Sequence, residues 1–523
     1  HANIAANLSQ IDEWGVGLFN PATRVLAVLP FDNESGDASM DYFAEGVADE
    51  VIVTLLRQSA LKVIGRTSAF QFRGARKSEA AAALRVTHVL DGAVRCSGAH
   101  MRVAAQLIDA ASGVAIWSER YTGERADAFA LEETIAAKVA AALKHSLTQN
   151  ERTIAPIDPG AHELYLRARQ VWLDLSDVSE VQAAVLLERC IKLAPNFAAG
   201  WAALASVRAF LLPRDRDVIG APAHRAALDA ANRALVIDPD CATAFAALAL
   251  LKPGFGAHGE KLALMDEALR RMPNDSSLHL TRASFLLGVG RVRDAGAALE
   301  EARRLDPLGV AVEGFRANLA AARGDVEDAV EIILDARARW PDSAFIWHRT
   351  WTILCLAGRV NEAMALAAPS ARPGPEVTER DVDALRTHVA LLLTPQAERA
   401  KACAALLEAQ AQSQAPLELA VIALCAGLGD AEAAFDAIEA ALDQGRAIRP
   451  DSHDAFGMAR AQSAMQIFIP AGGAPLFRSA RFPALAARLG LARYWIESGK
   501  WPDCAEAAPY DFKAACAEAA SRA

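Results

Sequence analysis

The sequence repeats one helical ending four times, in RALVIDP (233–239), ALRRMP (268–273), EARRLDP (301–307) and DARARWP (335–341). Successive prolines in this set are 34 residues apart. Proline ends a helix because it lacks the backbone N–H that the next turn needs. Paired helices repeated at such an interval bury their apolar faces only by stacking on neighbouring pairs. The stretch from Pro239 to Pro341 therefore predicts a helical solenoid.

Small and apolar residues keep the same register between these prolines. Gly290 and Gly324 occupy the expected turns, where glycine permits a left-handed backbone. Residues suited to close helix crossings follow each turn: Ala295, Leu299 and Ala302 before Pro307, and Ala329, Ile333 and Ala336 before Pro341. The period and the register resemble the tetratricopeptide repeat. Later residues restore the scheme, so we expect the array to continue past a break: Gly429, Ala434, Ile438 and Ala441.

The predicted array extends beyond the regular stretch from Pro239 to Pro341, and its outer parts are less regular. Helical pairs are expected from Pro156 onward, and the interval from Pro195 to Pro239 exceeds the regular one by ten residues, which predicts an insertion near 210–222. The predicted fold class is an α+β N-terminal domain followed by an all-α tetratricopeptide-repeat solenoid. The predicted divisions are a linker (1–24), the α+β domain (25–150), repeats (156–370), a loop (371–381), further helical repeats with a cap (382–495) and a C-terminal tail (496–523).

A change of pattern in front of the repeats predicts the α+β domain. VLAVLPF (25–31) and LKVIGR (61–66) are short apolar runs typical of buried strands, and the segment between them repeats apolar residues every four positions, as an amphipathic helix does. A short helix in KSEAAAALR precedes three β-like runs, and a helix over about 127–147 closes the unit. The order β-α-β-α-β-β-β-α favours an α+β fold.

The same segment resembles a known family. VLAVLPFDNESGDASMDYFAEGVADEVIVTLL, VIGRTSAFQFRG and THVLDGAVRCSGAHMRVAAQLIDAASGVAIWSERY are similar to the TolB N-terminal-like domain of bacterial signalling proteins, nearly continuously from Val25 to Leu147. In that family the domain typically precedes tetratricopeptide repeats, with a winged-helix DNA-binding domain or a nucleotide cyclase domain upstream. The resemblance therefore implies a role in signalling, and neither upstream domain is part of this sequence.

Composition argues against several functions. The 523 residues carry a net charge of -10 and no Lys/Arg run, whereas binding of nucleic acid needs a basic face, so we predict no direct contact with nucleic acid. No charge-free apolar run is long enough to span a bilayer. The chain opens on HANIAANLSQ without an initiator Met, so we expect a preceding segment, and a membrane anchor there is one expectation.

Motifs for catalysis are missing from the sequence. GxxxxGK[ST], GxSxG, HExxH and CxxC do not occur. His162-Glu163 lacks the second histidine of a zinc helix, and DNESGD (32–37) lacks the glycine and glutamate placement of a calcium loop. We therefore predict that the chain is not an enzyme and holds no cofactor and no metal.

The expected binding surface is the concave groove of the solenoid. By the resemblance, certain residues of each first helix face that groove, and the register maps six there: Ser206, Phe210, Ser284, Asn318, His348 and Thr352. Amide, hydroxyl and imidazole groups suit a peptide backbone. The alternative for the polar residues is an ordinary solvated helix face, and Phe210 equally suits the core. The predicted partner is a protein or peptide, and pairing of solenoids through their ends or edges leaves an oligomer open.

The eight cysteines do not form a disulfide framework. Most lie in apolar helical stretches and suit the core: Cys190, Cys241, Cys355 and Cys425. Cys504 and Cys516 flank AEAAPYDFKAA outside any repeat register, where a disulfide would staple the tail. Two free thiols are the equal alternative, because spacing does not fix connectivity.

Three hypotheses of function follow. The first is a non-catalytic sensor and protein-interaction region that forms the periplasmic part of a membrane-anchored winged-helix transcription regulator. The second is the regulatory C-terminal half of a cytoplasmic nucleotide cyclase. The third is a periplasmic scaffold protein. The residues before His1 distinguish them, since a basic winged-helix pattern, a cyclase domain and a signal peptide differ in sequence.

Overall fold

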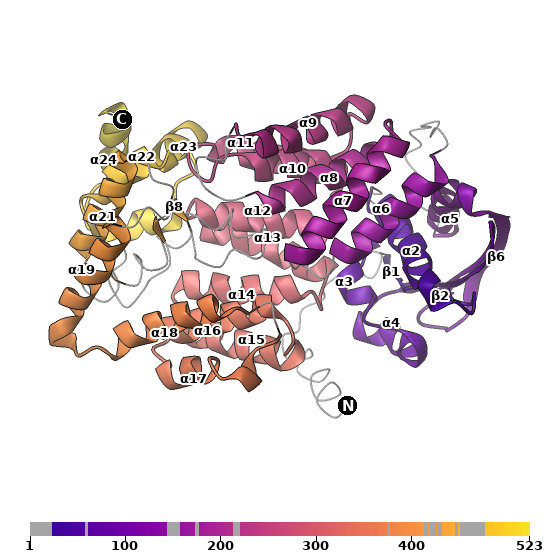
Figure 1. The fold of residues 1–523 in the computed structure, drawn as a ribbon, viewed down its shortest axis with the longest axis horizontal. Helices are drawn as coiled ribbons and strands as arrows, with labels where there is room; N and C mark the ends of the chain where they lie inside the picture. The colour runs from indigo at the N-terminus through magenta and orange to yellow at the C-terminus, as the bar shows by residue number, and fades with distance from the viewer. Residues whose placement is uncertain are drawn as a thin grey trace.

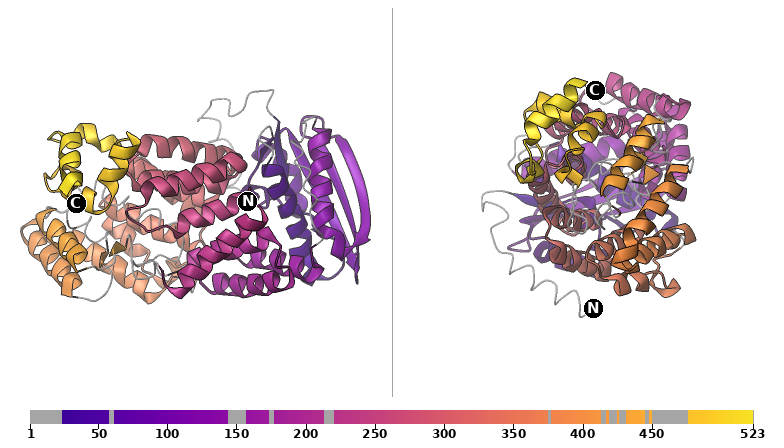
Figure 2. Two further views of the ribbon diagram at one scale, coloured as in Figure 1. Left: turned by 90° about the horizontal axis from the view of Figure 1, so that it is seen from above. Right: turned by 90° about the vertical axis from the view of Figure 1, so that its left-hand side faces the viewer.

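The computed structural model describes residues 24–57, 61–143, 157–172, 177–212, 220–374, 377–412, 417–418, 425, 431–444, 448–449 and 476–522. A sheet with its helices lies at one end of the molecule and the C-terminal helices lie at the other (Figures 1 and 2). Between them a long run of helix pairs curves through the middle. This arrangement confirms the predicted fold class, an α+β N-terminal part followed by an all-α solenoid.

The N-terminal part is built on a sheet in the order β3-β1-β4-β5-β6. β1 pairs in parallel with β3 and β4, while β4, β5 and β6 form an antiparallel meander. Helices α2 and α5 pack against each other and against the sheet. The elements are β1 (Val25–Val28), β2 (Asp32–Asn33), α2 (Asp41–Leu56), β3 (Lys62–Val63), α3 (Arg66–Ala69), α4 (Ala80–Ala83), β4 (His88–Ser97), β5 (His100–Asp109), β6 (Ala115–Glu124) and α5 (Ala128–Ala142).

The predicted element order is present, with two short additions. β2 and α3 carry too few residues to show a period, so the sequence pattern did not reveal them. The helix expected in KSEAAAALR is a 3-10 segment, Gly74–Glu79, followed by the single turn α4. The chain then reverses at Arg85, whose φ of 51 is left-handed. The last part of the helix predicted to residue 147 lies outside the described residues.

Helix pairs occupy the middle of the chain. Their bounds are α6 (Pro159–Trp172), α7 (Asp177–Leu193), α8 (Ala198–Leu211), α9 (Pro222–Ile237), α10 (Ala242–Leu251), α11 (His258–Arg271), α12 (Ser276–Gly288), α13 (Val292–Leu305), α14 (Val310–Arg323), α15 (Val326–Arg339), α16 (Ala344–Leu356), α17 (Val360–Ala365), α18 (Glu379–Leu393), α19 (Gln396–Gln412) and α21 (Ala431–Asp443). The C-terminal helices are α22 (Phe482–Arg488), α23 (Leu491–Ser498) and α24 (Phe512–Arg522).

The 34-residue register is present in the helices. α9, α11, α13 and α15 each end just before a repeated proline. Gly290 and Gly324 have φ of 75 and 91, the left-handed turn that the sequence predicted. The predicted crossing residues are buried: Ala295, Leu299, Ala302, Ala329, Ile333 and Ala336.

The irregular segments fall where the register breaks. The excess near 210–222 lies between Leu211, the end of α8, and Pro222, the start of α9, and residues 213–219 of it are outside the described range. α18 begins at Glu379, inside the segment predicted as a loop, because Thr378 and Asp381 form a capping box. Of the later register, Gly429 is outside the described residues, whereas Ala434, Ile438 and Ala441 are buried on α21.

The C-terminal segment is packed rather than extended. Phe512 and Cys516 on α24 are buried, and the Phe512 ring lies 5.5 Å from the ring of Trp495 on α23. These rings continue the core past the last helix pair, as the end of a solenoid requires. In the described ranges, the helices all fall short of the length and apolar character that crossing a membrane demands.

Candidate interaction site

The six predicted groove residues lie on four first helices of the array. Ser206 and Phe210 belong to α8, Ser284 to α12, Asn318 to α14, and His348 and Thr352 to α16. Ser284, Asn318 and Thr352 are 34 residues apart, so they hold the same position in three successive repeats. α12 contacts α14, and α14 contacts α16. The fold therefore brings this position together on neighbouring helices.

Three of the polar residues are buried rather than solvated. The exposed fraction is 5% for Ser206, 0% for Ser284 and 3% for Asn318. Within the described part of the chain, Ser284 Oγ and Asn318 Nδ2 have no hydrogen-bond partner. Each buried polar group without a partner costs about 1–3 kcal/mol. An ordered water or a ligand would satisfy both groups.

His348 and Thr352 are partly buried and belong to a local network. Thr352 Oγ1 donates a hydrogen bond of 2.9 Å to the His348 carbonyl, one turn earlier in α16. His348 Nε2 lies 3.9 Å from Asp381 Oδ1, in the first turn of α18. Asp381 was not predicted as a neighbour of His348, although the pattern TERD carried the helix-start signal that fixes its place.

Phe210 makes a helix contact. Its ring lies 5.5 Å from the ring of Trp172 on α6, in an edge-to-face arrangement. Such aromatic pairs stabilise a core beyond their buried area. In this structure Phe210 holds α8 against α6.

Two tryptophans on α16 share the character of Ser284 and Asn318, and the sequence did not single them out. Trp347 and Trp351 are buried, and neither indole N–H has a hydrogen-bond partner among the described residues. Buried indole N–H groups usually find an acceptor. Trp351 occupies the repeat position that Ala283 and Ala317 occupy in the two preceding repeats. This replacement of a small residue by a large one is the feature of the sequence that could have drawn attention to Trp351. We call Ser284, Asn318, Trp347 and Trp351 the unpaired polar set.

The α+β part is fixed to the solenoid through the turns in front of α12 and α14. Gly65 N donates to the Leu305 carbonyl at 2.6 Å, and Ser68 N donates to Asp306 Oδ1 at 2.8 Å. Leu308 N in turn donates to Ser68 Oγ at 2.8 Å. A Cβ at Gly65 would lie 2.9 Å from the Asp306 carboxyl carbon, so only glycine permits this approach.

Asp306 is the buried centre of that contact. Burial raises the pKa of its carboxyl to about 6, while hydrogen bonds from Ser68 act in the opposite direction. The residue is 8% exposed, so solvent screens its carboxyl little. A second contact joins the turn before α12, where Asn274 Nδ2 donates to the Leu61 carbonyl at 2.9 Å. The α+β part therefore spans two successive inter-repeat turns.

A charged layer joins α2 to α6. Arg169 on α6 lies 2.9 Å from Asp49 and also pairs with Glu50, both on α2. Arg66 lies 3.5 Å from the same Asp49. Pairing compensates these carboxylates for the water they lose, so the layer adds little net stability, whereas loss of one partner would leave a buried charge unpaired.

A buried acid and base join α5 to α6 beside this layer. His162 Nε2 lies 3.3 Å from Glu132 Oε2, and the two residues are 3% and 1% exposed. Burial raises the pKa of Glu132. Burial lowers the pKa of His162 and Glu132 raises it, with a net rise. Both shifts favour the protonated form of each side chain.

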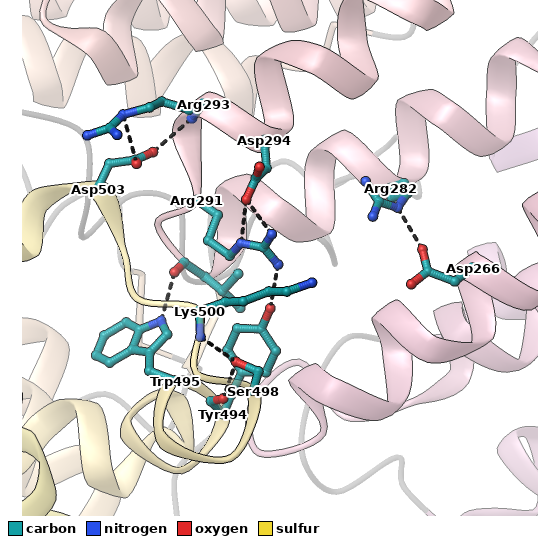
Figure 3. Close-up of polar contacts among 11 residues, drawn as sticks. Asp266, Arg282, Arg291, Arg293, Asp294, Tyr494, Trp495, Ser498, Lys500 and Asp503 are labelled. Carbon is teal, nitrogen blue, oxygen red and sulfur yellow. Dashed lines mark hydrogen bonds and ion pairs between the residues drawn. The ribbon is translucent and has the colours of Figure 1, made fainter.

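The C-terminal segment holds the turn between α12 and α13 (Figure 3). Trp495 Nε1 donates to the Val289 carbonyl at 3.0 Å, and Arg291 Nη1 donates to the Tyr494 hydroxyl at 2.9 Å. Asp503 N donates to the Gly290 carbonyl at 2.9 Å. Residues from both ends of the described chain thus converge on the α12–α13 pair.

Cys504 and Cys516 are free thiols in this structure. Burial raises the pKa of each thiol to about 12. Both are therefore protonated at neutral pH, and protonated thiols are poor nucleophiles. The other cysteines expected in the core behave in two ways: Cys190, Cys355 and Cys425 are buried, whereas Cys241 is partly exposed.

The helix pairs, their register and their left-handed glycine turns define a tetratricopeptide-type solenoid behind a small α+β unit. No protein-family model matches the chain. A curated protein of Rhizobium meliloti (strain 1021), named "Putative adenylate cyclase 3", is 35% identical over 193 residues, which is 36% of this chain and 33% of that protein. The chain therefore spans about a third of the length of this relative.

Solved structures resemble the chain in fold. Yeast Tom70 is 18% identical, with 61% of this chain and 67% of Tom70 covered and a TM-score of 0.33. TTC0263 of Thermus thermophilus, described as a thermophilic TPR protein, is 20% identical, with 45% of this chain and 98% of TTC0263 covered and a TM-score of 0.24.

Proposed function

We propose that the chain is a protein-binding, regulatory region of a bacterial signalling protein. Its binding site would be formed by the unpaired polar set on α12, α14 and α16. The observation that carries the proposal is that buried polar groups on three successive first helices have no hydrogen-bond partner among the described residues. Stability alone does not account for them, because apolar side chains of similar volume would remove the cost.

The chemistry of the set suits a peptide backbone. Indole N–H and amide N–H groups donate hydrogen bonds, and a serine hydroxyl can donate as well. A peptide in extended form supplies carbonyl oxygens at regular intervals and needs no charge to be recognised. We therefore propose a peptide segment of a protein as the ligand, in keeping with an array that lacks a Lys/Arg cluster.

Burial links binding to a movement of the helices. Ser284 and Asn318 are within the array, so a peptide reaches them only when neighbouring first helices separate. The ligand would bind the opened array better than the closed one and shift the population toward it. A regulatory region of this type reports the presence of its partner as a change of shape.

The name of the curated relative supports a nucleotide cyclase as the larger protein. We propose that catalysis belongs to a domain outside this chain and that the chain itself does not turn over nucleotide. Incubation of the purified chain with ATP and Mg²⁺ should give no cyclic AMP, and turnover would contradict the assignment. The winged-helix regulator, the periplasmic location and the scaffold protein remain hypotheses.

The test compares two asparagines. Asn318→Leu replaces the buried amide by an apolar side chain of similar volume, whereas Asn361→Ala changes an exposed asparagine on α17. The tagged chain and both variants are used to capture proteins from cells of the source organism, and each recovered partner is quantified by mass spectrometry. We expect Asn318→Leu to lose a specific partner and to keep or raise the melting temperature, because it removes an unpaired buried group.

Three outcomes decide the proposal. Loss of the partner with the melting temperature maintained supports a binding role for Asn318. Recovery of the partner equal to that of Asn361→Ala places the binding site elsewhere. A large drop in melting temperature for Asn318→Leu assigns Asn318 a structural role and removes the observation on which the proposal rests.

A further inference from the structure

The sheet of the α+β part ends in a long strand with an open outer side. β6 is the last strand in the order, and its outer side pairs with no strand among the described residues. Figures 1 and 2 place it at the end of the molecule opposite the C-terminal helices. Exposed and half-buried residues alternate along its length. An unpaired strand of this kind presents a row of free N–H and C=O groups.

The hydrogen-bond pattern identifies which backbone groups are free. Arg125 N donates to the Ala99 carbonyl at 2.7 Å, one residue past the pair His100 and Glu124. Antiparallel pairs alternate between those that exchange hydrogen bonds and those that do not. The odd-numbered residues of β6 therefore point their backbone groups toward β5. The even-numbered residues direct theirs to the open side: Ser118, Arg120, Thr122 and Glu124. Of these, the Glu124 N–H already donates to Asp127 Oδ2 at 3.3 Å, so at Glu124 only the carbonyl is left for a further strand.

Two common protections of an edge strand are missing from β6, although the strand carries the charged residues Glu119, Arg120 and Glu124. It contains neither proline nor lysine, residues that commonly block a further strand. The one irregularity of the β5–β6 pairing lies between Leu107 and Ile108, at the opposite end of the strand from Glu124. The segment from Ser118 to Glu124 is therefore regular, exposed and able to accept another strand.

We propose that β6 pairs antiparallel with β6 of a second copy of this chain, with Thr122 facing Thr122 of that copy. The sheet then continues across the two copies through their backbone hydrogen bonds. A two-fold axis at Thr122 is an isologous contact, in which each copy uses the same residues.

Charge complementarity selects this register. With Thr122 on the axis, Arg120 faces Glu124 of the second copy, and the symmetry repeats the pair. With Arg120 on the axis, two arginines face each other. With Glu119 on the axis, two glutamates face each other. Arg120 makes no ion pair within the described part of the chain, and both it and Glu124 are exposed. The Glu124 carboxylate already accepts the Asp127 backbone N–H in a capping box, so its second oxygen is the one left for Arg120 of the second copy.

The test uses charge exchange on the purified chain. Sedimentation velocity from 1 to 100 µM at low salt should show a species of twice the 55.6 kDa chain mass. Arg120→Glu should weaken the dimer by about tenfold or more, because two attractive pairs become repulsive. Glu124→Arg should do the same. The double variant Arg120→Glu/Glu124→Arg restores opposite charges and should restore the dimer.

Two further variants separate the edge from the rest of the sheet. Thr122→Pro removes a backbone N–H on the open side, so we expect a monomer with an unchanged far-ultraviolet spectrum. Arg95→Glu makes the same charge change on β4, away from the edge, and should dimerise as the wild type does. A monomer at every concentration, a dimer that survives Thr122→Pro, or a double variant that stays monomeric would each overturn the proposal.

Discussion

Asp306→Asn should remove a pH dependence from the contact between the α+β part and the solenoid. The carboxyl has a pKa of about 6 in the folded chain against an ordinary value of 3.8, because burial disfavours its charge. A raised pKa means that the folded chain holds the proton more tightly. The stability that the protonated group contributes is present below the ordinary pKa and is lost as the pH rises through about 6.

The size of the effect follows from the shift. Two units of pKa correspond to about 3 kcal/mol in total, of which roughly half, about 1.4 kcal/mol, falls between pH 5 and pH 7.5. A free-energy change of about 1.4 kcal/mol corresponds to a factor of about ten in the equilibrium constant for opening the contact between the α+β part and the solenoid. An asparagine oxygen still accepts the Ser68 hydrogen bond and carries no charge, so the variant should lose this factor.

Amide hydrogen exchange reads the contact directly. Gly65 N and Ser68 N both donate across it, so their protection measures its opening. After correction for intrinsic exchange, wild-type protection at these amides should fall about tenfold from pH 5 to pH 7.5. Asp306→Asn should show little change, and Asp342→Asn, an exposed aspartate after the next repeated proline, should behave as the wild type.

The result that refutes this reasoning is specific. Equal pH dependence in wild type and Asp306→Asn would show that another group titrates. No pH dependence in the wild type would show that the carboxyl keeps its ordinary pKa.

Three further predictions concern stability. Burial raises the pKa of Glu132, and the neighbouring Glu132 carboxylate raises the pKa of His162, so the stability that the two protonated groups contribute falls as the pH rises. The urea concentration at the midpoint of unfolding should therefore drop between pH 6 and pH 8.5, and it should drop less in His162→Gln. Gly290→Ala forces a side chain into a φ of 75 and should cost about 1 kcal/mol, measured as a lower melting temperature. Trp495→Phe leaves the Val289 carbonyl without its donor, at a cost of about 1–3 kcal/mol, and limited proteolysis should release residues 476–522 faster.

The repeats were predictable because their signals are local. A proline ends a helix, a glycine adopts a left-handed turn and an alanine allows a crossing, each within one repeat. The same residues recur at a fixed interval, so four copies of the signal reinforced one another. The strands of the α+β part were predictable for a similar reason, since each apolar run is continuous in sequence.

The contacts between distant segments were not predictable. Ser68 and Asp306 are 238 positions apart, and no periodic pattern relates them. The sequence around Trp495 and Asp503 does not predict that these residues contact the turn at Gly290. Such contacts depend on how the whole array curves, which results from many small packing angles summed along the chain.

The sequence predicted which helices carry Ser284 and Asn318, but not how deeply the two residues are buried. The register placed Ser284 and Asn318 on successive first helices, and the structure agrees. Nothing in the repeat pattern indicated that both are buried, because burial at that position depends on the neighbouring repeats. Trp351 shows the same limit: its place in the register was readable, but its unpaired indole N–H was not.

The most direct measurement of the central claim is a calorimetric titration of the chain with a peptide from its captured partner. We predict that Asn318→Leu, with its melting temperature maintained, loses at least about tenfold in affinity, the value of one good hydrogen bond in a buried site. Asn361→Ala should bind as the wild type does. Equal affinity for wild type and Asn318→Leu would contradict the claim that the unpaired polar set is the binding site.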